Sequence, residues 1–318
     1  MFSTDDAPLP ALPARDPRGH KGTFGTVGLV GGCAMPASRM IGAPALAARG
    51  ALRCGAGLVR LVTPAPVLDA AIGAEPSATG IALPTDASGA IVPHEAAEVL
   101  DDVLEKCDTL VIGCGMGEEP GAAALALRAV AQESVPIVVD AGAITALART
   151  PEFWLDLRGP CVLTPHPGEF AHLAAALSIA GDATSDRDRP RLASMVAQRL
   201  GCVVVLKGAG TVVSDGLRAW TCARGHPCMG TAGTGDVLAG VIGAFAAFAS
   251  VGPMVAALAR AGKAPSGLSL YDAARMGVEA HARGGEAWAL RTGAQAGMLA
   301  RELADELPNI MDGMRSPA

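Results

Sequence analysis

The chain has 318 residues, of which 50% are hydrophobic and 3% aromatic, and its formal net charge at pH 7 is −6. This length suits one large α/β domain or two small ones, and the mild acidity argues against a nucleic-acid-binding surface. Alanine and the 40 glycines supply much of the apolar content, so we expect helices that pack closely on one another and on a sheet.

The two ends of the chain differ in composition from the rest. Residues 1–17 are acidic and rich in proline, and they lack the basic and apolar regions of a signal peptide. We therefore expect a mobile arm over residues 1–17, a folded domain over residues 18–310 and a mobile tail over residues 311–318. Because no stretch is rich enough in Pro, Gly or Ser to act as a linker, a single domain is predicted.

Between these ends, short apolar runs alternate with helical segments at the spacing of βαβ units. A hairpin at the sheet edge and a helical region with breaks at Gly284 and Gly293 follow. The alternation predicts an α/β fold with a mainly parallel sheet. Strands are predicted over residues 26–30, 57–62, 108–112, 136–139, 161–163 and 202–206, helices over 38–54, 120–132 and 189–200, the hairpin over 211–213 and 218–221, and the helical region over 271–307.

Residues 237–259 carry no charge and could span a membrane on length alone. However, Gly240, Gly243, Gly252 and Pro253 interrupt the stretch, and a polar turn precedes it. A pair of buried helices is therefore the better interpretation, and we expect no contact with a membrane.

The eight cysteines are scattered, and they form neither a Cys-x-x-Cys pair nor a Cys/His cluster at zinc spacing. Several lie inside strand-like runs, as Cys161 and Cys202 do. This distribution indicates buried thiols in a reducing compartment, so we expect a cytoplasmic protein.

Polar or glycine-rich residues directly follow several predicted strands. Gly115 lies in a Gly-x-Gly-x-Gly run, His166 stands between two prolines, and Lys207 begins the sequence Lys-Gly-Ala-Gly-Thr. Taken singly, these are a tight turn, a lone histidine and a strand-terminal lysine. In an open parallel sheet, however, ligands bind outside the carboxyl ends of the strands, so together the loops predict one crevice. The glycine run lacks the dinucleotide-binding spacing, and the chain contains no Walker A sequence.

The strongest local signal lies in residues 225–240, where Gly233-Thr234-Gly235-Asp236 leads into an apolar segment. Glycines let the backbone approach a ligand closely, and a helix N-terminus offers N–H groups and its positive dipole end to a phosphate. Asp236 is either an N-cap or a functional acid. Because a cap does not need several glycines around it, we predict an anion hole at Gly233, Thr234 and Gly235, with Asp236 as a candidate base.

Six segments, in the same order along the chain, resemble the ADP-dependent NAD(P)H-hydrate dehydratases of the ribokinase-like superfamily. The resemblance implies a single-domain, three-layer α/β/α ribokinase-like fold around a mainly parallel sheet. It also implies a repair reaction, in which the (S)-form of hydrated NADH or NADPH is dehydrated to NAD(P)H while ADP is converted to AMP and phosphate. The segments are Lys21-Gly-Thr-Phe-Gly, Gly42-Ala43, Gly55-Ala56-Gly57-Leu58-Val59, Thr164-Pro-His-Pro-Gly-Glu169, Lys207-Gly-Ala-Gly-Thr211 and Gly230-Thr-Ala-Gly-Thr-Gly-Asp236-Val-Leu-Ala-Gly.

The resemblance further implies roles for individual residues. Asp236 would deprotonate the ring hydroxyl, which attacks the terminal phosphate, and the phosphorylated hydrate would then eliminate phosphate. Mg²⁺ is expected with ligands that the sequence does not identify, ADP is expected as co-substrate, and a homotetramer is expected because family members commonly form one. The implied contacts to the hydrate are Ala43, Gly115, His166 and Asp236, and those to the nucleotide are Lys207, Gly208, Ala209, Gly210, Thr211 and Gly235.

The chain also departs from the family pattern. The family usually has Asn at the position of His226, Gly at Cys228, Pro at Cys114, Asp at Gly142 and often Ser at Thr234. Many members carry an N-terminal epimerase domain, whereas we expect a stand-alone dehydratase here. Two other interpretations stay open: a kinase of the same superfamily that acts on a vitamin precursor, and a non-catalytic nucleotide-binding protein.

Overall fold

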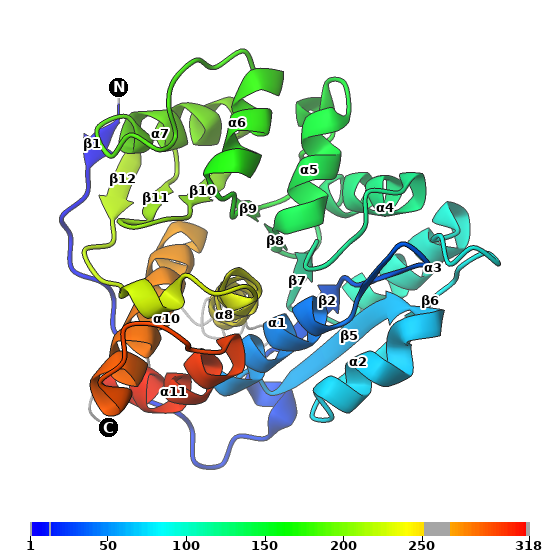
Figure 1. Cartoon of the computed structure of the whole chain (residues 1–318), viewed down its shortest axis with the longest axis horizontal. Coiled ribbons are helices and arrows are strands. Elements are labelled where there is room, and N and C mark those ends of the chain that lie inside the picture. The colour runs from blue at the N-terminus through cyan, green and yellow to red at the C-terminus, as the bar shows by residue number, and fades with distance from the viewer. Residues whose placement is uncertain (1, 13, 251–267, 316–318) are drawn as a thin grey trace, which may run out of the picture.

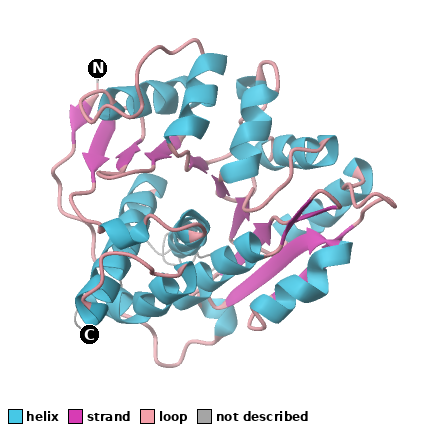
Figure 2. Cartoon of the chain, viewed as in Figure 1, coloured by secondary structure: helices cyan, strands magenta, loops and turns pink. Residues whose placement is uncertain are grey.

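A ten-stranded sheet runs through the middle of the molecule (Figures 1 and 2), in a computed structural model that describes residues 2–12, 14–250 and 268–315. The strand order is β1-β12-β11-β10-β9-β8-β7-β2-β5-β6. A separate hairpin is formed by β3 (Cys33–Met35) and β4 (Ser38–Met40). The sheet strands are β1 (Ser3–Thr4), β2 (Thr26–Val30), β5 (Leu58–Pro64), β6 (Thr79–Leu83), β7 (Thr109–Ile112), β8 (Ile137–Val139), β9 (Cys161–Leu163), β10 (Val203–Leu206), β11 (Val212–Ser214) and β12 (Arg218–Thr221).

From β10 through β6 every neighbouring pair in the sheet is parallel. Only β11 runs antiparallel to both of its neighbours, as the predicted hairpin requires. The central strands β2, β7, β8, β9 and β10 are buried along their whole length, which explains why they consist of continuous apolar runs instead of alternating ones. The mainly parallel sheet expected from the sequence is confirmed.

Helices cover both faces of this sheet, so the fold has three layers (Figure 1). Each layer shares its own apolar core with the sheet face that it covers. One layer contains α1 (Gly42–Arg53), α2 (Leu68–Ala74), α8 (Thr234–Ser250), α10 (Leu270–Thr292) and α11 (Ala300–Gly313). The other contains α3 (Pro93–Leu104), α4 (Pro120–Val130), α5 (Ala141–Arg149), α6 (Pro167–Ala176) and α7 (Arg189–Leu200).

Glycines allow α1 and α8 to cross at close range. A Cβ atom added to Gly240 would lie 1.8 Å from the carbonyl oxygen of Ala47, and one added to Gly50 would lie 2.5 Å from that of Val237. Side chains at these two positions would force the helices apart. The close packing expected from the alanine and glycine content is therefore present here, and it fixes where α8 begins relative to the sheet.

Two elements differ from the sequence-based prediction. Residues 38–40 form β4, and α1 begins only at Gly42, because the chain first turns back on β3. Gly284 does not break the last helical region, because α10 passes through it. The predicted break at Gly293 is correct, since this residue ends α10 with φ of +69°.

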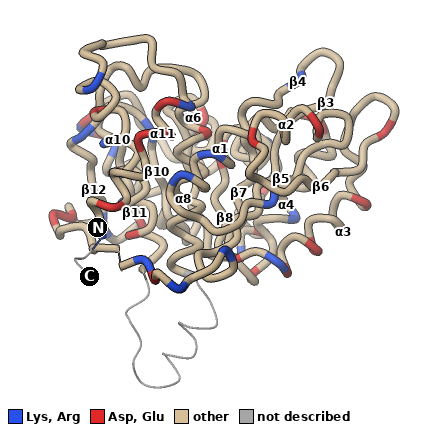
Figure 3. The backbone as a smooth tube through the Cα atoms, turned by 90° about the horizontal axis from the view of Figure 1, so that it is seen from below, with Lys and Arg blue, Asp and Glu red and all other residues tan. Residues whose placement is uncertain are grey.

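The uncharged stretch predicted as two buried helices is described only in part. Helix α8 occupies residues up to Ser250, and residues 251–259 of that prediction lie outside the described part of the chain. Among the helices that are described, none combines the length and the apolar character needed to cross a bilayer. Acidic and basic residues are intermixed along the described chain (Figure 3).

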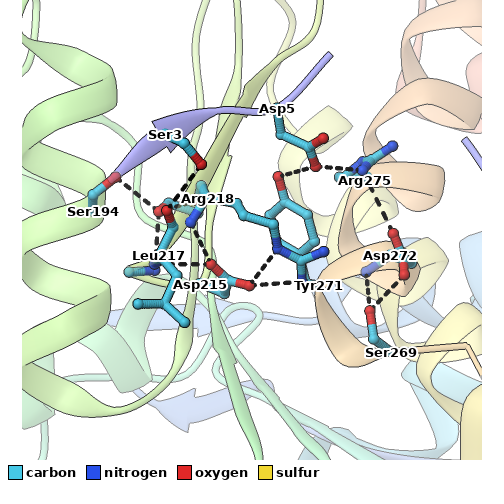
Figure 4. Close-up of polar contacts among 12 residues, drawn as sticks. Ser3, Asp5, Ser194, Asp215, Leu217, Arg218, Ser269, Tyr271, Asp272 and Arg275 are labelled. Atoms are coloured by element: carbon cyan, nitrogen blue, oxygen red, sulfur yellow. Dashed lines mark hydrogen bonds and ion pairs between the residues drawn. The ribbon is translucent and has the colours of Figure 1, made fainter. Parts of the chain in front are cut away.

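The first residues of the chain contact the edge of the sheet and one helix. Strand β1 adds to β12 in parallel, and Asp5 accepts hydrogen bonds from Arg275 at 2.6 Å and Tyr271 at 2.9 Å (Figure 4). At the other end, α11 continues to Gly313, inside the segment predicted as a tail. The mobility predicted for residues 1–17 and 311–318 stays a prediction, but the residues named here have specific partners on the domain.

Candidate active site

The carboxyl ends of four adjacent strands meet at one edge of the sheet. In the order β7, β8, β9 and β10, they are followed by Gly113, Asp140, Thr164 and Lys207. The N-terminus of α8 lies against the same edge, since a Cβ atom added to Gly235 would lie 3.6 Å from the ammonium of Lys207. The structure thus brings the predicted anion hole and the predicted lysine together.

Local geometry explains the sequence at the start of α8. Gly233 has φ of +93°, and a Cβ atom there would lie 2.6 Å from Leu46 Cδ1, so only glycine fits. The Thr234 hydroxyl lies 2.9 Å from the carbonyl oxygen of Thr231, which holds the turn that leads into the helix. The first N–H groups of a helix have no intrahelical acceptor, so this end of α8 can receive an anion.

A buried histidine supports the same turn. Nε2 of His281, on α10, lies 2.8 Å from the carbonyl oxygen of Thr234. Burial lowers the pKa of His281 to about 4, so the ring is neutral at physiological pH and donates its Nε2 proton to that carbonyl. His281 therefore ties α10 to the first residue of α8.

Lys207 is held between carboxylates. Its Nζ lies 2.5 Å from Asp140 Oδ1 and 3.9 Å from Glu169 Oε2. Burial disfavours the ammonium, but the charges of Asp140 and Glu169 outweigh this and raise the pKa of Lys207 above its ordinary value. The lysine is thus a permanent positive charge beside the N-terminus of α8.

Asp140 is fixed by more than Lys207. Its Oδ1 accepts a hydrogen bond of 2.7 Å from the Thr164 hydroxyl, and its Oδ2 lies 3.9 Å from the thiol of Cys114. The next residue, Ala141, has φ of +46°, a left-handed conformation that L-residues rarely adopt. Such strain persists only where the surroundings enforce it, and it is concentrated at functional sites.

Asp236 lies within this cluster. One ligand atom from each of Cys114, Asp140 and Asp236 falls within 4.8 Å of the other two. Burial, reinforced by the charge of Asp140, raises the pKa of Asp236 to about 6, while a hydrogen bond from the Cys114 thiol and the charge of Lys207 oppose the rise. A carboxylate with this pKa is ionised at neutral pH yet accepts a proton more readily than an ordinary aspartate, which suits a general base.

The same three residues could be read as a metal site, but their chemistry does not fit Mg²⁺. Burial and the negative charges of Asp236 and Asp140 raise the pKa of Cys114 well above its ordinary value, so its sulfur stays protonated. Asp140 is already neutralised by Lys207. Mg²⁺ prefers oxygen ligands and commonly binds through substrate phosphates. A divalent cation that accompanies a nucleotide would thus be held mainly by the nucleotide itself.

The larger cleft has a volume of about 880 Å³ and is lined by the predicted nucleotide-binding residues. The Thr211 hydroxyl donates to the carbonyl oxygen of Gly208 at 2.9 Å and closes the glycine-rich loop. Arg189, which is 4% exposed, donates to the carbonyl oxygens of Leu206 and Gly210 and so supports the loop from within. Five predicted nucleotide contacts form this wall of the cleft, namely Lys207, Gly208, Ala209, Gly210 and Thr211, and Gly235 lines it too.

A second, smaller cleft is lined by Gly115, which among the described lining residues is the one predicted to contact the hydrate; Ala43, His166 and Asp236 do not line it. This cleft has a volume of about 640 Å³, and its lining includes Gly115, Gly142 and Glu169. Gly115 has φ of +64°, and a Cβ atom on it would lie 2.9 Å from the methyl group of Ala43, so these two predicted contacts are neighbours. His166 caps α6 at the same edge of the sheet and is exposed.

The departures at His226 and Cys228 have local structural roles. Nδ1 of His226 accepts a hydrogen bond of 3.2 Å from the N–H of Cys228, at the start of a short 3₁₀ helix (Pro227–Met229). Cys228 is buried, and its sulfur lies 3.4 Å from the carbonyl oxygen of Gly285. Neither residue belongs to the cluster around Asp236, although His226 lines the larger cleft.

Sequence reasoning did not assign five residues of this site. Asp140 and Glu169 could have been found by the rule that singled out Lys207, because Asp140 directly follows β8 and Glu169 lies in the first turn of the helix that follows β9. Cys114 stands out in the sequence only as a departure from the family pattern. Arg189 and His281 lie inside helices, where nothing in the local sequence distinguishes them from ordinary surface or core residues.

A mainly parallel sheet lies between two helical layers, and a glycine-rich helix N-terminus lies at the carboxyl ends of its strands; this is the ribokinase-like fold. A family model described as NAD(P)H-hydrate dehydratase matches residues 27–309. The chain belongs to the NAD(P)H-hydrate dehydratase family.

Individual relatives agree with this assignment. The ADP-dependent (S)-NAD(P)H-hydrate dehydratase of Xanthomonas campestris is 38% identical over 277 residues, which are 86% of this chain and 85% of that protein. The bifunctional NAD(P)H-hydrate repair enzyme of Moorella thermoacetica is 35% identical over 274 residues, or 86% of this chain but only 47% of that enzyme. This chain therefore matches about half of the bifunctional protein.

A solved structure is similar over nearly the whole chain. The ADP/ATP-dependent NAD(P)H-hydrate dehydratase from Bacillus subtilis, co-crystallised with ATP and Mg²⁺, superimposes with a TM-score of 0.73 at 26% identity. The match covers 96% of this chain and 99% of that one. The ribokinase-like fold and the family expected from the sequence are thus confirmed.

Proposed function

We propose that this chain dehydrates the (S)-form of hydrated NADH or NADPH at the expense of ADP and releases NAD(P)H, AMP and phosphate. The observation that carries the proposal is the position of Asp236, a partly buried carboxylate with a pKa of about 6 on the first turn of α8. The N-terminus of this helix faces the ammonium of Lys207. A base and an anion site are thereby adjacent. Family membership supplies the substrate class.

The chemistry follows from this adjacency. Asp236 takes the proton of the ring hydroxyl, and the resulting oxygen nucleophile attacks the terminal phosphate of ADP. The N–H groups at Gly233, Thr234 and Gly235, together with Lys207, stabilise the charge on the transferring group. Phosphorylation converts hydroxide, a poor leaving group, into phosphate, a good one, and elimination of phosphate restores the ring.

The nucleotide would occupy the larger cleft, with residues 207–211 around its phosphates, and the hydrate would occupy the smaller one near Ala43, Gly115 and His166. Mg²⁺ would supply further charge neutralisation to the phosphates. Support for both ligands comes from the co-crystallisation of the Bacillus subtilis relative with ATP and Mg²⁺.

A direct assay tests the function. The purified chain is mixed with hydrated NADH, ADP and Mg²⁺, and the absorbance of the reduced nicotinamide is followed while AMP is quantified by chromatography. Equal amounts of reduced nicotinamide and AMP are expected. A kinase of the same superfamily would instead leave the hydrate unchanged, and a non-catalytic binding protein would form no AMP.

We also propose that the chain works in the cytoplasm as a homotetramer. All eight cysteines are unpaired, which agrees with a reducing compartment. The tetramer rests on the family resemblance alone. Light scattering coupled to size-exclusion chromatography would measure the mass in solution, and a monomeric mass would contradict this part of the proposal.

A further inference from the structure

The proposed reaction removes two protons from the hydrated ring, and the site described so far accounts for one. The hydroxyl proton goes to Asp236. The second proton lies on the ring carbon next to the one that bears the hydroxyl, because a C=C bond forms only if one carbon loses oxygen and its neighbour loses hydrogen. If the proposed function holds, a second base is therefore needed on the hydrate side of the crevice.

Glu169 lies at the junction of the two clefts. Its side chain lines the smaller cleft, and its Oε2 lies 3.9 Å from Nζ of Lys207, which lines the larger one. The side chain is 11% exposed, so it is shielded from bulk water but accessible from the cleft. Burial raises the pKa of Glu169 above its ordinary value, although the charge of Lys207 opposes the rise.

An ordinary structural role explains only part of this arrangement. Glu169 and His166 form a capping box at the start of α6, in which Glu169 Oε2 accepts a hydrogen bond of 2.8 Å from the N–H of His166. The other oxygen, Oε1, lies 3.5 Å from Nε2 of His166, which is at the outer limit of a hydrogen bond. Capping thus engages one oxygen firmly and leaves the other able to accept a proton.

The neighbouring groups are less suited to this task. Nδ1 of His166 already accepts hydrogen bonds from the N–H groups of Gly168 and Glu169, so the neutral ring carries its proton on Nε2 and has no basic nitrogen left. Asp140 is engaged by Lys207 and Thr164 on one oxygen and faces Cys114 with the other. Two other carboxylates line the smaller cleft: Glu119 accepts backbone hydrogen bonds with both oxygens, and Glu118 is 63% exposed and pairs with Arg149. Among the described carboxylates of this cleft, Glu169 thus combines shielding from bulk water with an oxygen to spare.

We propose that Glu169 is a second catalytic base, which removes the proton from the ring carbon as phosphate leaves. The C–O bond breaks and its electron pair stays on the phosphate oxygen. The electron pair of the C–H bond forms the C=C bond, and the proton moves to the Glu169 carboxylate. Hydrate and ADP thereby give NAD(P)H, AMP and phosphate without an oxidant or a reductant. Lys207, between Glu169 and the anion hole, stabilises the departing phosphate.

The variant Glu169→Gln separates this role from capping, because glutamine also serves in a capping box. In a single turnover with hydrated NADH and ADP, AMP should form at the wild-type rate, whereas the return of reduced nicotinamide should slow by about 100-fold or more. Deuterium on the ring carbon that loses the proton should slow this return further in the variant than in the wild type. An unchanged melting temperature would show that capping is retained.

Glu302→Gln provides a matched control. Glu302 has the same position in α11, where its Oε2 accepts a hydrogen bond of 2.7 Å from the N–H of Leu299, and both products should form at wild-type rates in this variant. If AMP and reduced nicotinamide instead form at the same rate in Glu169→Gln, Glu169 is not the second base. This holds whether that common rate equals the wild-type rate or is lower. A wild-type enzyme that forms neither product would refute the proposed function itself.

Discussion

The ammonium of Lys207 lies 2.5 Å from Asp140 Oδ1, and the two side chains are only 16% and 2% exposed. The pair joins the ends of β8 and β10 and lies next to the N-terminus of α8. The pair therefore places a positive and a negative charge in the same site, and each has its own function. The lysine offers a positive charge to a phosphate, while the aspartate keeps that charge in place and adds negative potential at Asp236.

We expect Asp140→Asn to change both stability and the pH profile. The substitution removes the nearer of the two carboxylates beside the Lys207 ammonium and leaves Glu169, at 3.9 Å, so the free energy of unfolding should fall by about 2 kcal/mol. Because the charge of Asp140 helps to raise the pKa of Asp236, the acid limb of kcat/KM should move to lower pH. Urea denaturation and a pH–rate profile measure the two effects.

Asp101→Asn is the control for stability. Asp101 pairs with Arg128 on the surface, where both side chains are about half exposed, so its loss should cost less than about 1 kcal/mol. Equal destabilisation by the two variants would contradict the special role of the Asp140 pair.

The acid limb of the wild-type enzyme should be set by Asp236. A base must be deprotonated to act, so kcat/KM should fall as the pH drops below about 6, the pKa to which burial raises Asp236. Asp236→Asn should lower turnover by a factor of about 10² to 10⁴ while ADP still binds, which calorimetry can test. A profile that stays flat down to pH of about 4.5 would exclude Asp236 as the base.

The same pKa shift predicts a gain in stability for Asp236→Asn. An acid whose pKa is higher in the folded than in the unfolded state stabilises the fold only while it is protonated. The stabilisation by protonated Asp236 is therefore lost as the pH rises from 3.8 through about 6. Above that range the ionised, partly buried Asp236 destabilises the wild type. At pH of about 8 the Asn variant should be more stable by on the order of 2 kcal/mol, and the difference should shrink at pH of about 4. Thermal melts at the two pH values measure it.

The thiol of Cys114 should tune Asp236 in the opposite direction to Asp140. Its hydrogen bond favours the ionised carboxylate and so lowers the pKa of Asp236. Cys114→Ala removes the donor, and the acid limb of kcat/KM should move to higher pH. Cys114→Ser keeps a donor and should stay near the wild-type profile. Cys107→Ala, at the opposite end of β7, should leave the profile unchanged; an identical shift in the Ala and Ser variants would exclude the hydrogen bond as the cause.

The sequence predicts the fold well where one local signal is sufficient. The predicted bounds agree within one or two residues with those of β2, β7, β8, β9 and β10. These strands are buried on both faces, so each is a continuous apolar run that is easily recognised in the sequence. Elements with mixed patterns, such as α2, α3 and β6, were not predicted. Their apolar residues face only one side and are interrupted by charged and small residues.

In the site, too, residues with a local sequence signal can be predicted, whereas contacts between distant segments cannot. Asp236, Lys207 and the glycine-rich turn carry signals in their own neighbourhood, and the strand-end rule places them in one crevice. The pairing of Asp140 with Lys207 joins residues 67 positions apart, and that of His281 with Thr234 joins residues 47 apart. Such pairs follow from the packing of whole elements, which no local pattern encodes.

The contact of Asp5 with Arg275 joins residues 270 positions apart and leads to a last prediction. Arg275 is 2% and Asp5 8% exposed, and the ion pair of 2.6 Å anchors the start of the chain to α10 (Figure 4). Asp5→Asn should leave the buried guanidinium with Asp272, 3.6 Å away, as its remaining acidic partner and lower the free energy of unfolding by about 2 kcal/mol. The neighbouring Asp6 is exposed, so Asp6→Asn should change it by less than about 0.5 kcal/mol. Urea denaturation of both variants tests whether the ion pair anchors the start of the chain. If Asp5→Asn is as stable as Asp6→Asn, the first residues of the chain behave as the mobile arm that the sequence predicts.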